Sequence, residues 1–472
     1  MQKKNILWLR EDFRLEDNPA LYEITKKNEK FTIFYVYNHK KFEDRSAQRW
    51  WLYQSLNNYQ KKLGNIGIKL EIYEGNEIDI VKNLIKNENI DTFYWNTVFT
   101  PQELSIEKKV ENLLDAKSIL YQKFNGNLLQ NPFDVKKKDN TPFQVFTPFW
   151  RTAEEIYLKS KNYFKKKINY KSKAISNANV DILEKKIKPN KDWYKKFNIY
   201  WKPGEDAAKS LLKNFIENNI KDYGTNRDIP SVAGTSKLSP YLAFGEISPQ
   251  YILDECYKIT KKNIGFRKYI NEIGWREFSH HLLYHFPTME KNNLRNQFDK
   301  FPWVNDRDKL NKWKKGITGY PIVDAGMREL YETGWMHNRV RMITASFLVK
   351  HLRIDWREGE KHFRDCLLDF NLPNNIAGWQ WVAGCGADAA PYFRIFNPIL
   401  QGEKFDPNGL YVKKWVKELK DIPKKYVHKP WEIPEMEKKL INFNLEKNYY
   451  KPIVDHKIAR ELALAAFKEL KK

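Results

Sequence analysis

The chain has 472 residues, and 83 Lys and Arg against 59 Asp and Glu give it a formal net charge of +24. Its hydrophobic content of 42% excludes a disordered chain, and no apolar run approaches the roughly 18 residues of a membrane-spanning helix. The three cysteines form no CxxC pair, which excludes a disulfide framework and fits a reducing cytosol. The positive charge indicates a polyanionic partner such as nucleic acid or, alternatively, a lysine-rich solvated surface.

Apolar runs alternate with amphipathic stretches over the first 130 residues. We expect helices at residues 48–63 and 78–86, because apolar side chains recur there with helical spacing. Short apolar runs beside them predict strands at residues 6–9, 31–37, 69–73, 92–95 and 118–124. This alternation predicts an α/β domain over residues 1–130, with a doubly wound parallel sheet of five strands.

The pattern changes after residue 130. Residues 131–204 are expected to connect two domains, and residues 159–202 alone carry 14 Lys against three acidic residues, a local charge of +11. From residue 205 to 472 the patterns predict an all-α domain. Its predicted helices cover residues 206–217, 249–259, 269–286, 322–333, 339–351, 359–368 and 457–470.

One segment of the predicted helical domain points to an anionic ligand. Ser239-Pro240 is typical of a helix start, with Ser239 as the N-cap and Pro240 as the first helical residue. Thr235, Ser236 and Lys237 then offer hydroxyls and an ammonium group at the positive end of that helix. This arrangement suits a diphosphate, and it is equally compatible with ordinary helix capping.

Arginine is distributed unevenly, since 12 of 18 lie between residues 227 and 394, interleaved with tryptophans. That pattern suits a nucleic-acid surface or a large planar cofactor, or else a tryptophan-rich core rimmed by arginines. His281 and His285 lie one helical turn apart, after Glu277, but packing histidines are the more frequent case, so we predict no metal. A glycosidase is disfavoured because no two carboxylates stand out as a pair.

Several motifs of uncommon residue types occur in a fixed order. They lie at residues 10–14, 146–149, 319–324, 335–342, 355–360, 375–381 and 388–398. Together they resemble the photolyase/cryptochrome family over nearly the whole chain, most densely between Tyr223 and Asp406. Within that family the motifs look most similar to the class I cyclobutane pyrimidine dimer photolyases.

The resemblance implies an N-terminal α/β antenna domain and a C-terminal all-helical domain that binds a U-shaped FAD. It also implies the reaction, in which blue light excites the reduced FAD and an electron passes to a flipped-out pyrimidine dimer in UV-damaged DNA. We therefore expect a deoxyribodipyrimidine photo-lyase, with a cryptochrome-type photoreceptor without repair activity as the alternative and a cofactor-free nucleic-acid-binding module as a third reading. We also expect a cytoplasmic, nucleoid-associated monomer of bacterial type that contacts no membrane.

The resemblance extends to single residues. Matching FAD-contact positions are Tyr223, Thr235, Ser236, Lys237, Leu238, Ser239, Tyr269, Arg276, Asn338, Arg341, Asp369, Asn371 and Asn375. Matching lesion or DNA positions are Arg227, Glu272, Trp275, Asn338, Arg339, Met342, Trp381 and Gln401. Matching electron-transfer positions are Trp379 next to the flavin, Trp356, and Trp303 at the surface. The implied catalytic roles fall to Glu272, a donor to the lesion carbonyl when protonated, to Asn338, and to Asn375, an amide facing flavin N5.

The sequence also departs from the family. Tyr269 stands where many relatives carry Trp, and Asn371 stands where a second Asp is usual. Residues 99–102 lack the His and the Asn-Glu pair that hold folate in some class I enzymes, so no motif supports folate as the antenna chromophore. The alternatives are folate bound without that motif, a deazaflavin, another flavin, or no antenna chromophore. Asn338 replaces the histidine of (6-4) photoproduct enzymes, and Trp381 retains the aromatic residue that single-strand-specific relatives usually replace.

Overall fold

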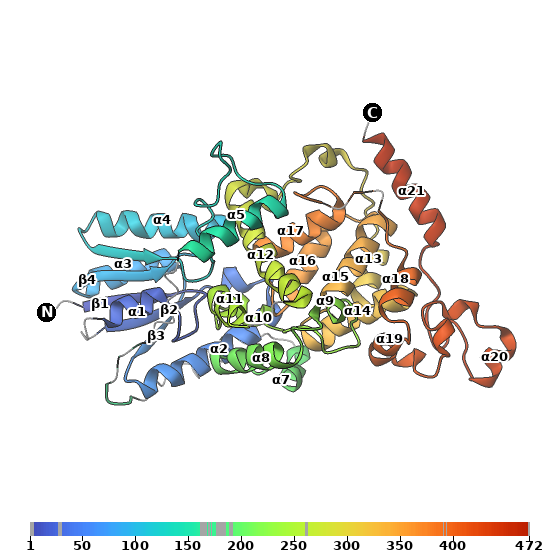
Figure 1. Ribbon diagram of the computed structural model, residues 1–472, viewed down its shortest axis with the longest axis horizontal. Coiled ribbons are helices and arrows are strands. Elements are labelled where there is room, and N and C mark those ends of the chain that lie inside the picture. The colour runs from blue at the N-terminus through green and yellow to red at the C-terminus, as the bar shows by residue number, and fades with distance from the viewer. Residues whose placement is uncertain are drawn as a thin grey trace.

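The computed structural model describes residues 4–26, 31–160, 168, 170, 172–175, 186–187, 192–259, 263–389, 391–392 and 394–470. Most of the lysine-rich stretch predicted as a linker, residues 159–202, lies outside the described residues. The strands gather at one end of the molecule, and the helices that follow residue 205 form the other end (Figure 1).

The N-terminal strands form one parallel sheet. The strands are β1 (Lys4–Leu9), β2 (Phe31–Tyr37), β3 (Leu70–Glu74), β4 (Ile90–Asn96) and β5 (Leu120–Phe124). Their order is β3-β2-β1-β4-β5, and every neighbouring pair runs parallel. The predicted five-stranded, doubly wound sheet is confirmed.

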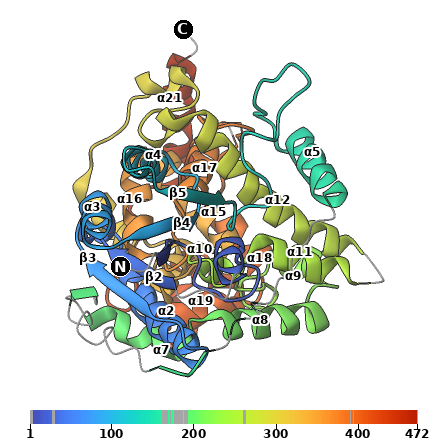
Figure 2. The same cartoon turned by 90° about the vertical axis from the view of Figure 1, so that its left-hand side faces the viewer.

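Side chains alternate between the two faces of this sheet, as a strand requires. Leu7 and Ile33 belong to the core that includes side chains of α1 (Pro19–Thr25) and α2 (Ser46–Asn65). Ile6 and Phe34 belong to a separate core with side chains of α3 (Glu77–Asn87) and α4 (Pro101–Asp115). Figure 2 looks onto this end and shows α4 and α2 on opposite sides of the strands. Both faces are therefore covered, which explains why the central strands β1 and β2 are buried along almost their whole length.

The rest of the described chain is helical. Its helices are α7 (Phe197–Tyr200), α8 (Glu205–Asn218), α9 (Tyr223–Asn226), α10 (Ser239–Ala243), α11 (Pro249–Tyr257), α12 (Ile264–His285), α13 (Arg307–Lys315), α14 (Pro321–Thr333), α15 (Asn338–Ser346), α16 (Trp356–Cys366), α17 (Leu372–Ala383), α18 (Pro398–Phe405), α19 (Leu410–Trp415), α20 (Glu435–Leu440) and α21 (His456–Glu469). The predicted all-α domain is confirmed. Within the described ranges, no helix has both the length and the apolar character needed to cross a membrane.

One predicted helix differs in kind. Residues 339–351 were expected to form a single α-helix, but α15 ends at Ser346 and a π-helical turn covers Phe347–His351. The turn buries Lys350 and His351. Lys350 Nζ donates to the carbonyl oxygen of Arg394 at 2.9 Å, and the His351 ring bonds that of His456 at 2.8 Å. These bonds supply partners for side chains that an apolar core would otherwise leave unsatisfied.

The predicted connection contains a helix, α5 (Phe146–Lys159), that packs on α12. The rings of Phe146 and Trp275 stack with centroids 3.8 Å apart and an interplanar angle of 8°. Gly274 faces the ring of Trp150 so closely that a Cβ atom would lie 2.5 Å from it. The first part of the connection therefore contributes to the core of the helical domain.

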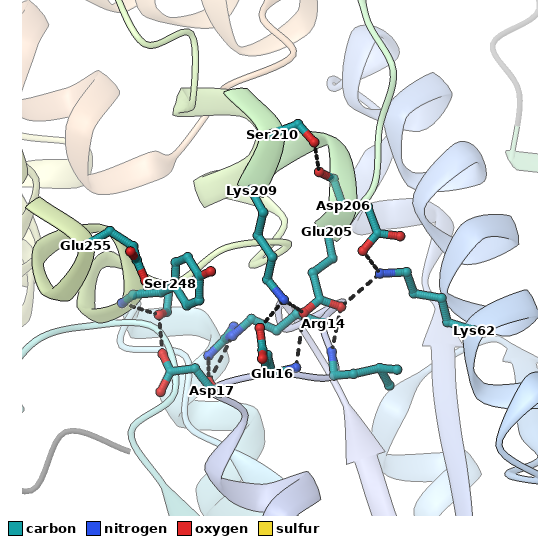
Figure 3. A network of polar contacts seen from close by, with 12 residues as sticks. Arg14, Glu16, Asp17, Lys62, Glu205, Asp206, Lys209, Ser210, Ser248 and Glu255 are labelled. Carbon is teal, nitrogen blue, oxygen red and sulfur yellow. Dashed lines mark hydrogen bonds and ion pairs between the residues drawn. The ribbon is translucent and has the colours of Figure 1, made fainter. Parts of the chain in front are cut away.

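A polar network joins the two ends of the molecule (Figure 3). Glu205 is the first residue of α8, and its carboxylate accepts hydrogen bonds from the backbone N–H groups of Leu15 and Glu16, at 3.0 and 3.1 Å. Lys62 of α2 and Lys209 of α8 donate to the same carboxylate at 3.1 and 2.7 Å. One buried carboxylate thus holds the loop after β1, α2 and α8 together.

Candidate functional site

A cavity of about 570 Å³ lies in the helical domain, lined by parts of α9, α10, α12, α15 and α17. Every residue predicted to contact FAD lines it: Tyr223, Thr235, Ser236, Lys237, Leu238, Ser239, Tyr269, Arg276, Asn338, Arg341, Asp369, Asn371 and Asn375. The predicted lesion residues that also line it are Arg227, Glu272, Trp275, Met342 and Trp381. Arg339 and Gln401 lie outside this lining. Residues between Tyr223 and Ala387 are thereby brought to one cavity.

At the predicted diphosphate end, the structure corrects one expectation. Helix α10 begins at Ser239, Leu238 precedes it, and no side chain caps its first turn. The Ser239 hydroxyl instead accepts a hydrogen bond from Trp335 Nε1 at 3.3 Å, because the fold places that indole directly beside it. With only five residues, α10 has little dipole, so the capacity for anions rests on the hydroxyls and the Lys237 ammonium.

Lys237 supplies that ammonium from a constrained position. Its backbone has φ +53°, in the left-handed region, and its Nζ lies 6.0 and 5.7 Å from the ring centroids of Trp201 and Trp335. Burial lowers the pKa of Lys237, while Glu329 opposes that shift. The Lys237 side chain is exposed, and a bound phosphate would provide its ammonium group with a counter-charge in the cavity.

At the predicted isoalloxazine end, polar groups are arranged around the open space. Arg341 Nη2 donates to Asp369 Oδ2 at 2.8 Å, which is the ion pair expected from the sequence. Arg341 Nε donates to the carbonyl oxygen of Met336 at 2.7 Å. Asn375 Nδ2 donates to Glu360 Oε1 at 3.0 Å, so the carbonyl oxygen of Asn375 is the atom available to a ligand. An acceptor at that place suits an N–H edge of a reduced ring.

The residues present fit a large planar cofactor such as FAD. Among the described residues, Asp369 Oδ1 and Trp379 Nε1 are buried without a hydrogen-bond partner. Both residues line the cavity, so a bound ligand would supply hydrogen-bond partners to these two atoms. Gly378 presents bare backbone to the cavity, since a Cβ atom there would meet nothing within 4 Å. A hydrogen-bond donor on Trp379, an acceptor on Asp369 and the bare backbone of Gly378 thus line the same cavity.

On another part of the lining, an acid and two indoles come together. The Arg227 guanidinium donates to Glu272 Oε1 in a close ion pair. Trp275 presents one face to Phe146 of α5, as described above, and half-buried Trp381 comes from α17. Aromatic faces beside a carboxyl group suit a flat, uncharged ligand with carbonyl groups.

Known proteins resemble this chain over its whole length. Residues 5–167 match the DNA photolyase family, and residues 269–469 match the FAD binding domain of DNA photolyase. A deoxyribodipyrimidine photo-lyase of Agrobacterium fabrum is 43% identical over 99% of this chain and 98% of its own. The chain belongs to the photolyase/cryptochrome family.

The chain is similar both to a class III photolyase and to a cryptochrome. The crystal structure of a class III photolyase from Agrobacterium tumefaciens has 40% sequence identity and a TM-score of 0.92, covering 100% of this chain and 98% of that one. Cryptochrome-2 of Arabidopsis thaliana is 35% identical over 99% of this chain and 79% of its own length. The expected family is therefore confirmed, whereas the expected class I subgroup is not established.

The three tryptophans that match the photolyase electron-transfer positions belong to one hydrophobic core. Trp379 and Trp356 are buried, and Trp303 is half-buried against Phe301, with ring centroids 4.4 Å apart. Trp356 Nε1 donates to Asn293 Oδ1 at 2.9 Å. Of the three, only Trp379 lines the cavity. Trp303 is thus the most exposed of the three, and their order from flavin to surface and their electron-transfer roles stay predictions.

Tyr269 and Asn371, the two residues that depart from the photolyase pattern, both make contacts that stabilise the fold. Tyr269 is buried, with its ring centroid 4.4 Å from Phe215 and 5.2 Å from Tyr223. Asn371 is the N-cap of α17 and accepts a hydrogen bond from the backbone N–H of Asn374 at 3.3 Å. Both side chains also line the cavity, so they change the surface offered to a flavin without opening the fold.

Open parallel sheets bind ligands at the edge where the strand order reverses, so an antenna chromophore of the N-terminal domain is expected at that edge. In this sheet the reversal lies between β1 and β4. Arg10, just after β1, pairs with Glu103 and Glu107 of α4 at 2.6 Å each. Asn96, at the end of β4, donates to Asp12 Oδ2 at 2.6 Å. Arg10 Nε and Asn96 Oδ1 are nevertheless buried without a hydrogen-bond partner, so these contacts leave the identity of an antenna chromophore undetermined.

The histidines that raised the question of a metal have structural partners. His281 Nε2 accepts from the backbone N–H of Phe143 at 3.1 Å. His281 Nδ1 and His285 Nε2 both lie within 3.2 Å of the carbonyl oxygen of Pro132. In the part of the chain that the structure describes, no group of three or more His, Cys, Asp or Glu side chains is placed to hold a metal ion.

Sequence reasoning assigned no role to several lining residues. Trp335, Met336 and Asn374 all line the cavity. Trp335 and Met336 adjoin Asn338 within the motif at residues 335–342, and Asn374 adjoins Asn375, so their proximity to predicted contacts was the available signal. Trp313 was also given no role, and its buried ring lies 6.2 Å from that of Trp379.

Proposed function

We propose that this protein repairs cyclobutane pyrimidine dimers in UV-damaged DNA under blue light. The observation that carries the proposal is the single cavity lined both by the residues matched to FAD and by Glu272, Trp275 and Trp381. When bound, reduced FAD supplies the light-excited electron donor of the reaction. The protein orients that cofactor through the Arg341–Asp369 pair and excludes water by burying Trp379.

The remaining lining residues act on the DNA. Trp275 and Trp381 offer flat faces on which an extruded dimer stacks, and extrusion is helped by the weakened pairing of a damaged base. Glu272 donates a hydrogen bond to a pyrimidine carbonyl when it is protonated, and Asn338 and Met342 contact the same dimer. Outside the lining, Arg339 and Gln401 contact the DNA backbone or its vicinity, which adds affinity without sequence preference.

The proposal is tested with the protein carrying reduced FAD and an oligonucleotide that contains one thymine dimer. We expect chromatography to show intact thymines after blue-light exposure and unchanged dimer in the dark. Loss of dimer in the dark, or no loss under light, would contradict the proposed reaction.

Replacing Trp275 with alanine should weaken binding to dimer-containing DNA by about 2 kcal/mol, because the variant loses one stacked aromatic face. The indole is held in place by stacking on the ring of Phe146. Affinities of damaged and undamaged duplexes are measured in parallel in the dark. Trp275→Phe should recover part of the loss, and equal affinity of the alanine variant and wild type would remove Trp275 from the lesion site.

Replacing Trp303 with phenylalanine should slow light-driven reduction of oxidised FAD severalfold, because phenylalanine is not oxidised by an indole radical. Repair by protein whose FAD was reduced chemically should stay unchanged. Trp431→Phe is the matched control, since Trp431 is another half-buried indole of the same core with no proposed role. Loss of repair in the pre-reduced Trp303→Phe protein would contradict the relay role.

A second candidate is a cryptochrome-type photoreceptor that binds FAD without repairing DNA. The similarity to cryptochrome-2 of Arabidopsis thaliana favours it. The same dimer assay separates the two, because a photoreceptor would show flavin photochemistry and no light-dependent reversal. The main proposal includes three finer expectations: a class I rather than a class III enzyme, a bacterial cytoplasmic monomer on the nucleoid, and a second chromophore of folate, deazaflavin or flavin type.

A further inference from the structure

Four linked charges lie at the lesion side of the cavity, and two of them, Arg227 and Glu272, line it. Arg227, just after α9, pairs with Glu272 of α12, and Arg227 Nε lies 3.8 Å from Asp228 Oδ1. Arg339 of α15 donates to the same Asp228 oxygen at 2.8 Å. Two arginines and two carboxylates therefore balance one another, and Glu272 depends on Arg227 as its direct counter-charge.

The side chains of Arg227 and Glu272 are partly exposed to solvent. About 19% of the Arg227 side chain and 31% of the Glu272 side chain are exposed. Arg227 also lies over the ring of Tyr223, with its guanidinium carbon 5.4 Å from the ring centroid, which fixes the plane of the fork. A planar guanidinium held in this way can bind a phosphate through two parallel N–H groups.

A phosphate that approaches Arg227 competes directly with Glu272. The guanidinium cannot keep its full pairing to both, and the arriving phosphate adds a negative charge beside the carboxylate. At the same time a stacked base over Trp275 removes water from the cavity, which weakens solvation of any charge left there. The ionised Glu272 side chain then loses both its partner and its water.

We propose that Arg227 passes from Glu272 to a DNA phosphate when the lesion enters the cavity, and that Glu272 takes up a proton in the same step. The proton comes from the solvent buffer and forms the O–H bond of the Glu272 carboxyl group, so the complex gains one proton. The DNA phosphate replaces the Glu272 carboxylate as the anion paired with Arg227. The inference rests on the proposed function and adds to it how Glu272 becomes a hydrogen-bond donor only when DNA is bound.

The groups around Glu272 agree with this sequence of events. Burial raises the pKa of Glu272 even in the free protein, while Arg227 opposes the shift, Asp228 adds to it and Arg339 opposes it more weakly. Arg339 is engaged by Asp228 and stacked over Phe405 at 4.4 Å, so it is not free to replace Arg227. Tyr223 and Tyr269, the phenols nearest to Glu272, have pKa values raised by burial and stay neutral. Without Arg227, the influences that raise the pKa of Glu272 therefore prevail.

The test counts protons. The protein with bound FAD is titrated in the dark with a duplex that contains one thymine dimer, by calorimetry in two buffers of different ionisation enthalpy. We expect wild type to take up a substantial fraction of one proton per complex near neutral pH. Because the complex binds more protons than the free protein, Kd should increase with pH, by up to about tenfold per pH unit between the two pKa values.

Variants separate this inference from a structural role. Glu272→Gln should bind dimer DNA without proton uptake, and Arg227→Gln should take up less than wild type because its Glu272 already lacks a partner. Arg339→Gln is the matched control: it should lower affinity and keep the wild-type proton count. Equal proton uptake in wild type and Glu272→Gln would overturn the handover, whereas failure of wild type to prefer dimer DNA would overturn the proposed function itself.

Discussion

Replacing Glu205 with alanine is expected to lower the free energy of unfolding by about 3 kcal/mol, because the change removes the central member of a buried ion-pair group. Glu205 has 3% of its side chain exposed and accepts four hydrogen bonds, from Leu15, Glu16, Lys62 and Lys209. About a quarter of each lysine side chain is exposed, so both ammonium groups can turn to water. The loss therefore falls at the lower end of the range for breaking a buried pair.

The pH dependence of this stabilisation follows from the pKa of Glu205. Burial acts to raise it, but Lys209 and Lys62 outweigh burial and hold the pKa below the usual value of 4.5. The unfolded chain therefore binds the proton more readily than the folded one. The contribution is fully present above about pH 4.5 and is lost as the pH falls through the lower, folded-state pKa. Denaturant midpoints of wild type and Glu205→Ala should converge in acid.

Asp206→Asn provides the matched control for Glu205→Ala. Asp206 is the next residue of α8 and pairs with the same Lys62 at 2.6 Å, but 80% of its side chain is exposed (Figure 3). Exposed pairs contribute about 0–1 kcal/mol, so this variant should unfold nearly as wild type does. Equal destabilisation by both variants would show that the buried carboxylate is not what joins the two ends of the molecule.

Replacing Gly359 with alanine is expected to destabilise the protein by about 2–3 kcal/mol, because the site is already filled by Trp379. A Cβ atom at Gly359 would lie 2.1 Å from Cη2 of Trp379. The indole cannot withdraw easily, since the rings of Phe363 and Trp313 lie 5.0 and 6.2 Å from it. Helices α16 and α17 must separate, which displaces the indole that lines the cavity.

Two measurements check the effect of Gly359→Ala. Thermal unfolding gives the stability, and light-driven reduction of bound FAD should slow because Trp379 is moved. Gly224→Ala is the control, as a Cβ atom there meets its nearest neighbours at an ordinary 3.6 Å. Both changes remove a helical glycine and gain a similar amount from helix propensity, about 1 kcal/mol at most. Equal stability of the two variants would contradict the close packing of α16 on α17.

Sequence periodicity predicted the elements well because it reports local burial. The β2 strand has the predicted bounds because all seven of its residues are buried, and the sheet has the predicted strands. The prediction that Ser239 caps a helix was wrong. Local sequence cannot report a competing donor, and Trp335 Nε1 reaches Ser239 from 96 residues away.

By itself the sequence determined the family, the two kinds of domain, and the set of residues that could contact a flavin, because motifs and periodicity are properties of neighbouring residues. The tertiary structure decided which of these residues share one cavity, and that Arg227 neutralises Glu272 across 45 positions of the chain. It also decided that Glu205 joins the two ends of the molecule. Pairing between distant charges depends on how helices pack, and no local pattern encodes that packing.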